Sequence, residues 1–384
     1  MSDVIVRTAT AADADQIVEL NRVHNGEDAV PPVRRLLEDP DVGPSCFTVA
    51  VDGSRVVSTL CLLRKVAVFR CHGVEVDVPL GEPEFVVTDP DYRWRRLIRD
   101  QIVVVHQWSQ QRGELAQSII GIPYFYRRFG YEYATMPLFD AVVDSRPSSP
   151  DGWTVRAATD DDVETIIGLQ RAAQRPFDVV VPMDAVHWRH MFSHLDGNLV
   201  AVSPSGEAAG YALRKAGGDL WLTAASAPEA VHALTAHAWT PGGIGVRIRP
   251  GTLAEGVLVR YERRSVRWGP YIRVPDVRAL LARVVPVLEA RLARSAFADA
   301  RGTLHLSFYT HGVAISYDGG RVEVGPGNAD ATSAFVPPDM LATLVFGGHG
   351  ASGLEARHPD VNLREERALM DTLFPQLTFD SIYW

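Results

Sequence analysis

Short runs in which apolar and polar residues alternate, separated by segments with helical spacing, divide this chain into strands and helices. The segment CFTVAVDGSRVVSTLCLL (46–63) alternates on both sides of Asp52-Gly53, a dipeptide that favours a tight hairpin turn. Two further strands are expected within 65–87 and another at 115–122. A helical pattern fills 99–113. Strands and helices in this succession predict a mixed α/β and α+β architecture.

The beginning of this pattern occurs twice in the chain. VRTATAADADQIVEL begins at Val6 and VRAATDDDVETIIGL at Val155, and the two align without a gap. Each is expected to form a strand and then a helix that opens with a capping box, Thr10 with Asp13 and Thr159 with Asp162. A second hairpin, NLVAVSPSGEAAGYALR (198–214), turns at Ser205-Gly206. The two copies predict a duplicated domain.

A third region follows the second copy. Apolar residues at helical spacing predict one helix over roughly 277–296, and TLHLSFYTHGVAISYDGGRVEV (303–324) alternates through a Gly319-Gly320 turn. The polar, proline-containing segment near 145–152 marks a boundary between the first two regions. We therefore expect three domains, at 1–147, 148–268 and 269–384.

Composition restricts the possible functions. The 384 residues are 46% hydrophobic and 22% charged, with a formal net charge of −9 and three cysteines without metal-type spacing. These values are typical of a soluble globular protein in a reducing cytoplasm, and the chain start has no secretory pattern. The acidic balance argues against nucleic acid as a partner, and no apolar run is long enough to span a membrane.

Positive charge is nevertheless concentrated at one turn. In FVVTDPDYRWRRLIR (85–99) an apolar strand ends at an acidic turn, and four arginines fall within seven residues at the start of a helix. The first N–H groups of a helix have no partner inside the helix and attract anions, and arginines add charge-assisted bonds to phosphate oxygens. The turn therefore predicts a diphosphate site, although a solvated basic helix start remains the alternative.

The residues of this turn resemble the pyrophosphate-binding signature of the GCN5-related N-acetyltransferases. Arg93 matches the first position of that signature, whereas Arg96 and Ile98 stand where glycine and a small residue are usual. A second segment, GIPYFYRRFGYEYA (121–134), resembles the Tyr–x–Arg–Phe–Gly–Tyr signature of the Eis-like acetyltransferases. That family has two tandem acetyltransferase-like domains, each a mixed sheet flanked by helices, and then a sterol-carrier-like domain. The resemblance therefore covers the whole chain.

The resemblance implies acetyl-coenzyme A as co-substrate and assigns residues to it. The diphosphate is expected at the arginine turn, the pantetheine arm along the first splayed strand, and the second splayed strand beside the cofactor. The implied cofactor residues are Phe85, Val86, Val87, Arg93, Trp94, Arg95, Arg96, Leu97, Ile98, Gly121 and Ile122.

Two catalytic groups are implied in the same way. Tyr126 matches the tyrosine that protonates the departing thiolate, although a plain core tyrosine in an aromatic cluster with Tyr124, Phe125 and Phe129 is the alternative. The α-carboxylate of Trp384 matches the proton acceptor, and a frayed tail is the alternative. His24, Glu27 and Asp28 are candidates for the border of the amine pocket.

These residues predict an N-acetyltransferase that acts directly on a small amine, possibly an aminoglycoside or another natural product. Two alternatives remain: a relative that binds without acetylating, and one that transfers another acyl or imino-type group. The family also implies a symmetric homo-oligomer, possibly a hexamer. His311 and His349 have no second ligand at suitable spacing, so no metal site is expected.

Overall fold

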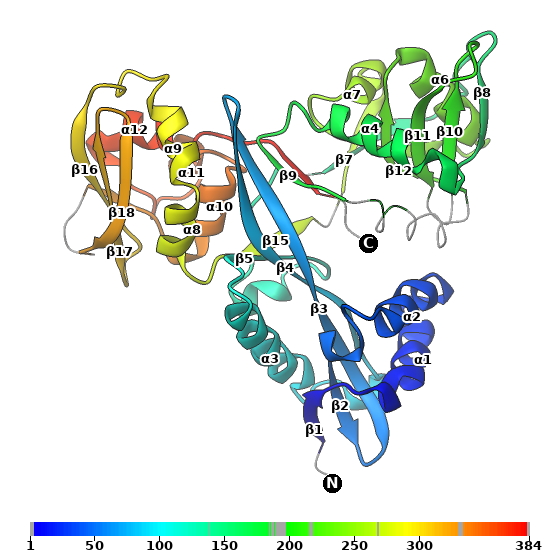
Figure 1. The fold of residues 1–384 in the computed structure, drawn as a ribbon, viewed down its shortest axis with the longest axis horizontal. Helices are drawn as coiled ribbons and strands as arrows, with labels where there is room; N and C mark the ends of the chain where they lie inside the picture. The colour runs from blue at the N-terminus through cyan, green and yellow to red at the C-terminus, as the bar shows by residue number, and fades with distance from the viewer. Residues whose placement is uncertain are drawn as a thin grey trace. The chain divides into compact units, whose positions relative to one another are not determined.

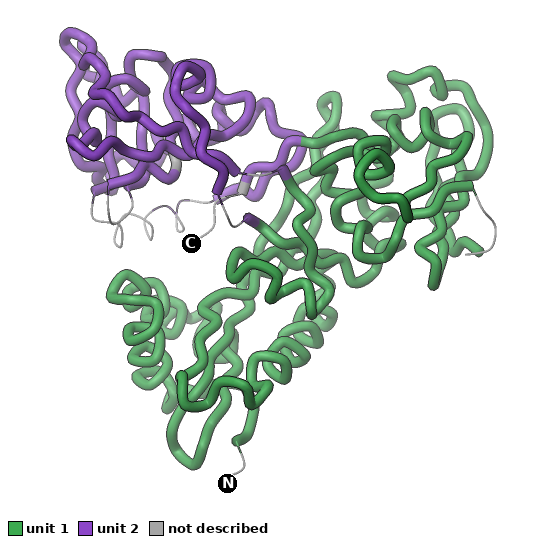
Figure 2. The backbone as a smooth tube through the Cα atoms, turned by 180° about the vertical axis from the view of Figure 1, so that it is seen from behind, with its two compact units in different colours: residues 1–135, 270–377 green, residues 136–269, 378–384 purple. Residues whose placement is uncertain are grey.

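The computed structural model describes residues 4–381 except 137, 184, 186–187, 189–196, 215–217, 267–268 and 329–332. The chain forms two compact units, each made from two stretches of sequence (Figures 1 and 2). Unit 1 comprises residues 1–135 and 270–377, and unit 2 comprises residues 136–269 and 378–384. None of the described helices is long and apolar enough to cross a membrane.

Unit 1 contains a mixed sheet whose strands run in the order β1-β2-β3-β4-β5-β15-β6. Its neighbours are antiparallel except for the parallel pair β4–β5. The strands are β1 (Ile5–Thr8), β2 (Phe47–Asp52), β3 (Arg55–Cys71), β4 (Val74–Thr88), β5 (Ala116–Ile120), β6 (Glu132–Tyr133) and β15 (Pro270–Arg273). The helices are α1 (Ala14–Asn25), α2 (Val30–Glu38) and α3 (Leu97–Gln111), with α3 on one side of the strands and α1 and α2 on the other (Figure 1).

One strand of this sheet is longer than the sequence pattern predicted. Residues 55–71 form a single strand, β3, which pairs along its length with β4. The expected division near residue 65 is therefore wrong. The chain reverses instead at His72-Gly73, both of which have positive φ angles of 50° and 86°. Strand β3 pairs with β2 over residues 55–61 and with β4 over residues 58–71, so its backbone pairing continues past residue 65 without a turn.

The rest of unit 1 combines helices with a small sheet of order β18-β17-β16-β19. Its strands are β16 (Arg301–Ser307), β17 (Gly312–Asp318), β18 (Arg321–Gly327) and β19 (Ala334–Phe335). Its helices are α8 (Val277–Arg283), α9 (Val285–Leu292), α10 (Leu341–Phe346), α11 (Ala351–Glu355) and α12 (Arg367–Leu373). The single helix expected over 277–296 is in fact two, because Pro286 lies in the first turn of α9 and cannot donate the bond that would continue α8.

Unit 2 is built on a second mixed sheet, of order β14-β7-β13-β12-β11-β10-β8. Its strands are β7 (Phe139–Val143), β8 (Thr154–Ala157), β10 (Leu199–Val202), β11 (Ala208–Arg214), β12 (Leu220–Ala225), β13 (Ile244–Ile248) and β14 (Glu262–Ser265). Its helices are α4 (Val163–Ala173), α6 (Pro228–Ala238) and α7 (Leu253–Leu258). A parallel pair joins β9 (Val179–Val181) to β20 (Phe379–Ser381).

The two large sheets share one plan and exchange one strand each. In both, a parallel pair lies in the middle, β4–β5 and β12–β13, and the next strand comes from a distant part of the chain. Strand β7 follows β6 in sequence but pairs with β13 and β14, whereas β15 follows β14 but pairs with β5 and β6. The units therefore divide the chain at 135/136, 269/270 and 377/378.

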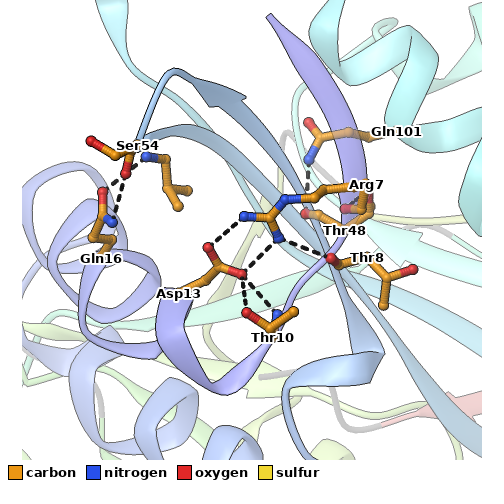
Figure 3. A network of polar contacts seen from close by, with 9 residues as sticks. Arg7, Thr8, Thr10, Asp13, Gln16, Thr48, Ser54 and Gln101 are labelled. Atoms are coloured by element: carbon orange, nitrogen blue, oxygen red, sulfur yellow. Dashed lines mark hydrogen bonds and ion pairs between the residues drawn. The ribbon is translucent and has the colours of Figure 1, made fainter.

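The two predicted capping boxes are confirmed, and each contains an arginine. Asp13 accepts hydrogen bonds from the Thr10 N–H (2.8 Å) and hydroxyl (2.9 Å), and from both terminal nitrogens of Arg7 at 2.7 and 2.8 Å (Figure 3). Asp162 repeats this arrangement with Thr159 and Arg156. Both helices are thereby tied to the strand that precedes them.

Candidate active site

The middle of the first sheet opens where β4 leaves β5. The parallel register between them joins only Leu80 to Ala116 and Gly81 to Gln117. Beyond that point β4 contains a bulge, where the register with β3 shifts by one residue and Phe85 adopts a φ of 52°. The Thr59 hydroxyl donates to the Phe85 carbonyl at 3.0 Å and holds the bulge. The backbone from Phe85 to Val87 therefore lies beyond the last residue pair that joins β4 to β5.

The arginine turn follows β4 directly, and contacts of its side chains with neighbouring residues hold it in place. Asp89 accepts from the Asp91 N–H at 2.9 Å and forms an ion pair with Arg55. The Tyr92 hydroxyl donates to Asp52 at 2.6 Å, and the Arg95 guanidinium lies 4.6 Å from the centre of the Tyr92 ring. The turn is thus held against the β2–β3 hairpin.

Two residues of the turn adopt left-handed backbone conformations. Trp94 has a φ of 69° and Arg96, which caps α3, a φ of 66°. This conformation costs a residue with a Cβ atom about 1–2 kcal/mol and is the usual reason for a glycine. Arg96 therefore adopts the left-handed backbone conformation that a glycine at this position would adopt at lower cost. The side chains of residues 93–96 are exposed, Trp94 to 98%.

Helix α3 begins immediately after Arg96 and presents free donors. The first backbone bond of the helix runs from Asp100 N–H to the Arg96 carbonyl, so the N–H groups of residues 97–99 have no partner within the helix. Leu97 is buried, whereas Ile98 is half-buried. Buried Gln101 anchors this turn, since its amide donates to the Thr48 carbonyl (Figure 3). The Ser58 hydroxyl lies within hydrogen-bond distance of both the Gln101 side-chain oxygen (2.7 Å) and the Val87 carbonyl (2.8 Å) and can donate to one of them at a time. Exposed guanidinium groups and oriented N–H groups thus converge on one helix end.

Tyr126 lies near the end of β5, in the short turn of helix formed by Tyr126–Phe129. Its side chain is 3% exposed and contacts the rings of Phe125, Tyr131 and Tyr271 edge-on, with centroids 5.2–6.2 Å apart. A Cβ atom on Gly121 would lie 2.5 Å from the Tyr126 ring, so only glycine allows the ring against the strand end. Phe129 contacts Phe125, and Tyr124 is 68% exposed. The aromatic cluster foreseen as the alternative therefore exists, and Tyr126 belongs to it.

The environment of Tyr126 affects the acidity of its hydroxyl group. Burial, followed by the nearby Glu84 carboxylate and Tyr271, raises the pKa of the Tyr126 hydroxyl above its ordinary value. No described residue accepts a hydrogen bond from this hydroxyl. The hydroxyl is therefore protonated at neutral pH and donates to no described neighbour, so a proton is present for transfer, although the raised pKa makes the group a weaker acid.

The sequence interpretation missed a cluster of buried charged side chains on β3 and β4. Lys65 Nζ lies 3.2 Å from Glu82 Oε2, and both side chains are nearly inaccessible. Burial raises the pKa of Glu82 and, together with the charge of Glu82, that of Glu84. Two carboxylates two residues apart on an apolar strand could have revealed this cluster. Tyr271, in contrast, arrives from a distant segment that gives no local signal.

The other predicted residues are placed as follows. Ile122 lies just beyond β5 and is 63% exposed. His24 is half-buried near the end of α1, Asp28 is exposed, and Glu27 forms an exposed ion pair with Arg22 at 2.9 Å. Trp384 lies outside the described residues. Among the described residues there is no group of three or more metal-ligating side chains.

Residues 5–134 match the family model described as an acetyltransferase (GNAT) domain. This segment holds the splayed strands, the arginine turn and Tyr126. It is a GNAT acetyltransferase domain. The chain therefore carries the domain of an N-acetyltransferase, as the sequence predicted, over about a third of its length.

Solved structures resemble the whole chain at low identity. A GCN5-related N-acetyltransferase from Kribbella flavida is 17% identical with a TM-score of 0.70, covering 100% of this chain and 99% of that one. A probable N-acyltransferase of unknown function from Enterococcus faecalis V583 is 14% identical with a TM-score of 0.71 over both full chains. Eis1 from Mycobacterium abscessus is 16% identical with a TM-score of 0.60, covering 97% of each. These likenesses show the fold alone. No curated protein matches the sequence.

Proposed function

We propose that this protein is an acetyl-coenzyme A-dependent N-acetyltransferase that transfers the acetyl group directly to the amine of a small molecule. The observation that carries the proposal is the coincidence, within one GNAT domain, of splayed strands β4 and β5 with an arginine-rich start of α3. A thioester supplies an activated acetyl group, and the protein's task is to hold it beside the amine and to manage two protons.

The residues present fit this cofactor. Arg93 and Arg95, with the backbone N–H groups from Arg96 to Ile98, offer the donors that a diphosphate needs. The backbone of Phe85, Val86 and Val87 borders the opening between β4 and β5, so that an extended amide-bearing arm can pair with it as an added strand does. Trp94 and Leu97 complete the turn, and Gly121 and Ile122 border the opposite strand end.

Within this proposal, Tyr126 donates the proton that the departing thiolate needs. Its raised pKa keeps that proton in place throughout the neutral range. The α-carboxylate of Trp384 receives the proton lost by the amine and holds the cationic form before reaction. His24, Glu27 and Asp28 border the acceptor, which we expect to be an aminoglycoside or another amine-bearing natural product.

The same proposal extends to the architecture. The shared strand order and the repeated Arg–Thr–Asp arrangement support a tandem of two acetyltransferase-like domains in the manner of Eis proteins. The helices and small sheet of residues 274–377 support a sterol-carrier-like third domain. We further propose a cytoplasmic homo-oligomer.

Mass spectrometry of acetylated products tests the function. The purified chain, acetyl-coenzyme A and a panel of amines (kanamycin, neomycin, spermidine and a lysine peptide) should yield a product 42 Da heavier, roughly the mass of one acetyl group, in the reaction of the chain with an aminoglycoside. Absence of product with every amine would contradict it. Product from another acyl thioester alone would favour the alternative of a different transferred group.

A further inference from the structure

The last described strand of the chain is embedded in unit 2. Strand β20 (Phe379–Ser381) pairs in parallel with β9, joining Phe379 to Val179, Asp380 to Val180 and Ser381 to Val181. Just before it, Thr378 and Asp178 bind each other, because the Asp178 carboxylate accepts from both the N–H and the hydroxyl of Thr378 at 2.8 Å. The C-terminal segment is therefore held by backbone pairing to β9 and by the hydrogen bonds between Thr378 and Asp178.

One side chain of this strand carries a buried ion pair. Asp380 is 5% exposed, and Arg249 donates to it through Nε at 2.8 Å and Nη2 at 2.5 Å. The Gln174 amide donates to the same carboxylate at 2.7 Å, and Gln170, which accepts from Arg249 and from the Tyr211 hydroxyl, lies at 3.4 Å. The pair is thus enclosed by hydrogen bonds from helix α4 and strand β11.

A buried ion pair such as Arg249–Asp380 fixes the relative position of its two side chains more than it stabilises the fold. Removing two charges from water cancels most of their attraction, and a well-packed apolar pair is often as stable. A two-pronged guanidinium–carboxylate contact, in contrast, fixes both position and direction. The pair therefore fixes the position and direction of β20, the last described strand.

Unit 2 shows no sign of a cofactor site of its own in its described residues. The helix that follows its central strand β12 is α6, which begins with Pro228 and Glu229. Proline removes one of the free N–H groups and glutamate repels an anion, and no arginine lies in that turn. The described residues of this turn in unit 2 therefore lack the arginines on which the proposed diphosphate site of unit 1 depends.

We propose that unit 2 is a holder for the chain's own C-terminal segment and that the Arg249–Asp380 pair is the positioning contact that sets where the chain end acts. In this proposal Asp380 is a positioning residue, because it acts through the residues that follow it. The proposal rests on the proposed function, in which the terminal carboxylate accepts a proton.

Asp380→Asn tests it, because the amide keeps the size of the side chain and removes its charge. Asp140→Asn is the matched control: Asp140 accepts from Arg247 at 2.6 Å, two residues before Arg249, but the pair does not involve the C-terminal segment. Hydrogen–deuterium exchange should accelerate at least tenfold at residues 378–381 in Asp380→Asn and not in the control. In the amine assay, kcat should fall about 10- to 100-fold, the scale expected for a misplaced catalytic group, with the KM for acetyl-coenzyme A within about twofold.

A second variant keeps the test decisive if a lone buried Arg249 prevents folding. Arg249→Gln with Asp380→Asn leaves a neutral amide pair and should show the same faster exchange and lower kcat. Unchanged exchange in either folded variant would overturn the holder. Faster exchange with unchanged kcat would overturn the positioning role and leave acetyl transfer standing. A wild-type chain without turnover on any amine would instead refute the proposed function, and exchange alone would then decide whether the segment is held.

Discussion

At the scale of single residues, the proposed function depends on residues with unusual backbone conformations or a shifted pKa. Arg96 and Trp94 adopt conformations that favour glycine, and Tyr126 retains its proton through burial. None of these states is visible in the sequence, because each arises from neighbours that the fold supplies.

Tyr126→Phe tests the proton donor. Only the hydroxyl is lost and the ring contacts remain, so the fold should survive while the rate of acetyl transfer falls roughly 100- to 10,000-fold, the usual scale of general acid catalysis. Tyr131→Phe is the matched control in the same cluster, since its hydroxyl donates to buried Gln117. It should lower the free energy of unfolding and leave the rate nearly unchanged. Equal rates in wild type and Tyr126→Phe would assign Tyr126 to the core alone.

Arg96→Gly tests the strain in the turn. Glycine relieves a left-handed conformation worth about 1–2 kcal/mol but costs about 0.5–1 kcal/mol in chain entropy, so we expect net stabilisation of roughly 0.5–1 kcal/mol and a higher Tm. Arg93→Gly is the control, because Arg93 has a φ of −58° and gains no relief. A Tm that falls equally in both variants would show that Arg96 is not strained.

At the scale of elements, the two capping boxes have the same arrangement of hydrogen bonds. The hydrogen bonds from Arg7 lower the pKa of Asp13 from 3.8 to about 2, despite the opposing effect of burial. A carboxyl group with a depressed pKa in the folded state stabilises the fold above its unfolded pKa and loses that effect as the pH falls through the folded one. The stabilisation by Asp13 should therefore disappear between about pH 4 and pH 2.

Asp13→Asn and Asp162→Asn test this equivalence. Each should lower the free energy of unfolding at neutral pH by about 1 kcal/mol, the usual cost of a lost helix cap. The difference from wild type should shrink in chemical denaturation as the pH falls from about 4 towards 2, because the unfolded chain there binds a proton that the native carboxylate still lacks. A constant difference across that range would exclude the proposed linkage.

The elements also show how far sequence reasoning reaches. Local signals located the capping boxes, the turns at Gly206 and Gly319-Gly320, helix α3 and the arginine turn, because each depends on residues adjacent in sequence. They missed Pro286 as a helix break and the exchange of β7 and β15 between the sheets. Strand pairing depends on which edge lies nearby in the folded chain, and a short apolar segment such as Pro270–Arg273 carries no information about its partner.

At the scale of the whole molecule, the proposal predicts a closed oligomer. Light scattering at micromolar concentration should give the mass of an oligomer, and the family resemblance favours a hexamer, with six times the mass of one chain. A particle with the mass of one chain would contradict this prediction.

A C-terminal extension tests the role of the chain end in the whole molecule. Residues added after Trp384 move the carboxylate away from its proposed position, so they should lower the rate more than a tag of the same length at the N-terminus. Full activity in the extended protein would remove the carboxylate role and leave Tyr126 unaffected.

The central claim is that the arginine turn and the splayed strands bind coenzyme A, and calorimetry with coenzyme A tests it most directly. We predict a dissociation constant in the micromolar range or tighter, about −8 kcal/mol, and a loss of roughly 1–3 kcal/mol in Arg93→Ala, the scale of one charged hydrogen bond. The absence of both heat and a thermal shift at millimolar coenzyme A would contradict the account.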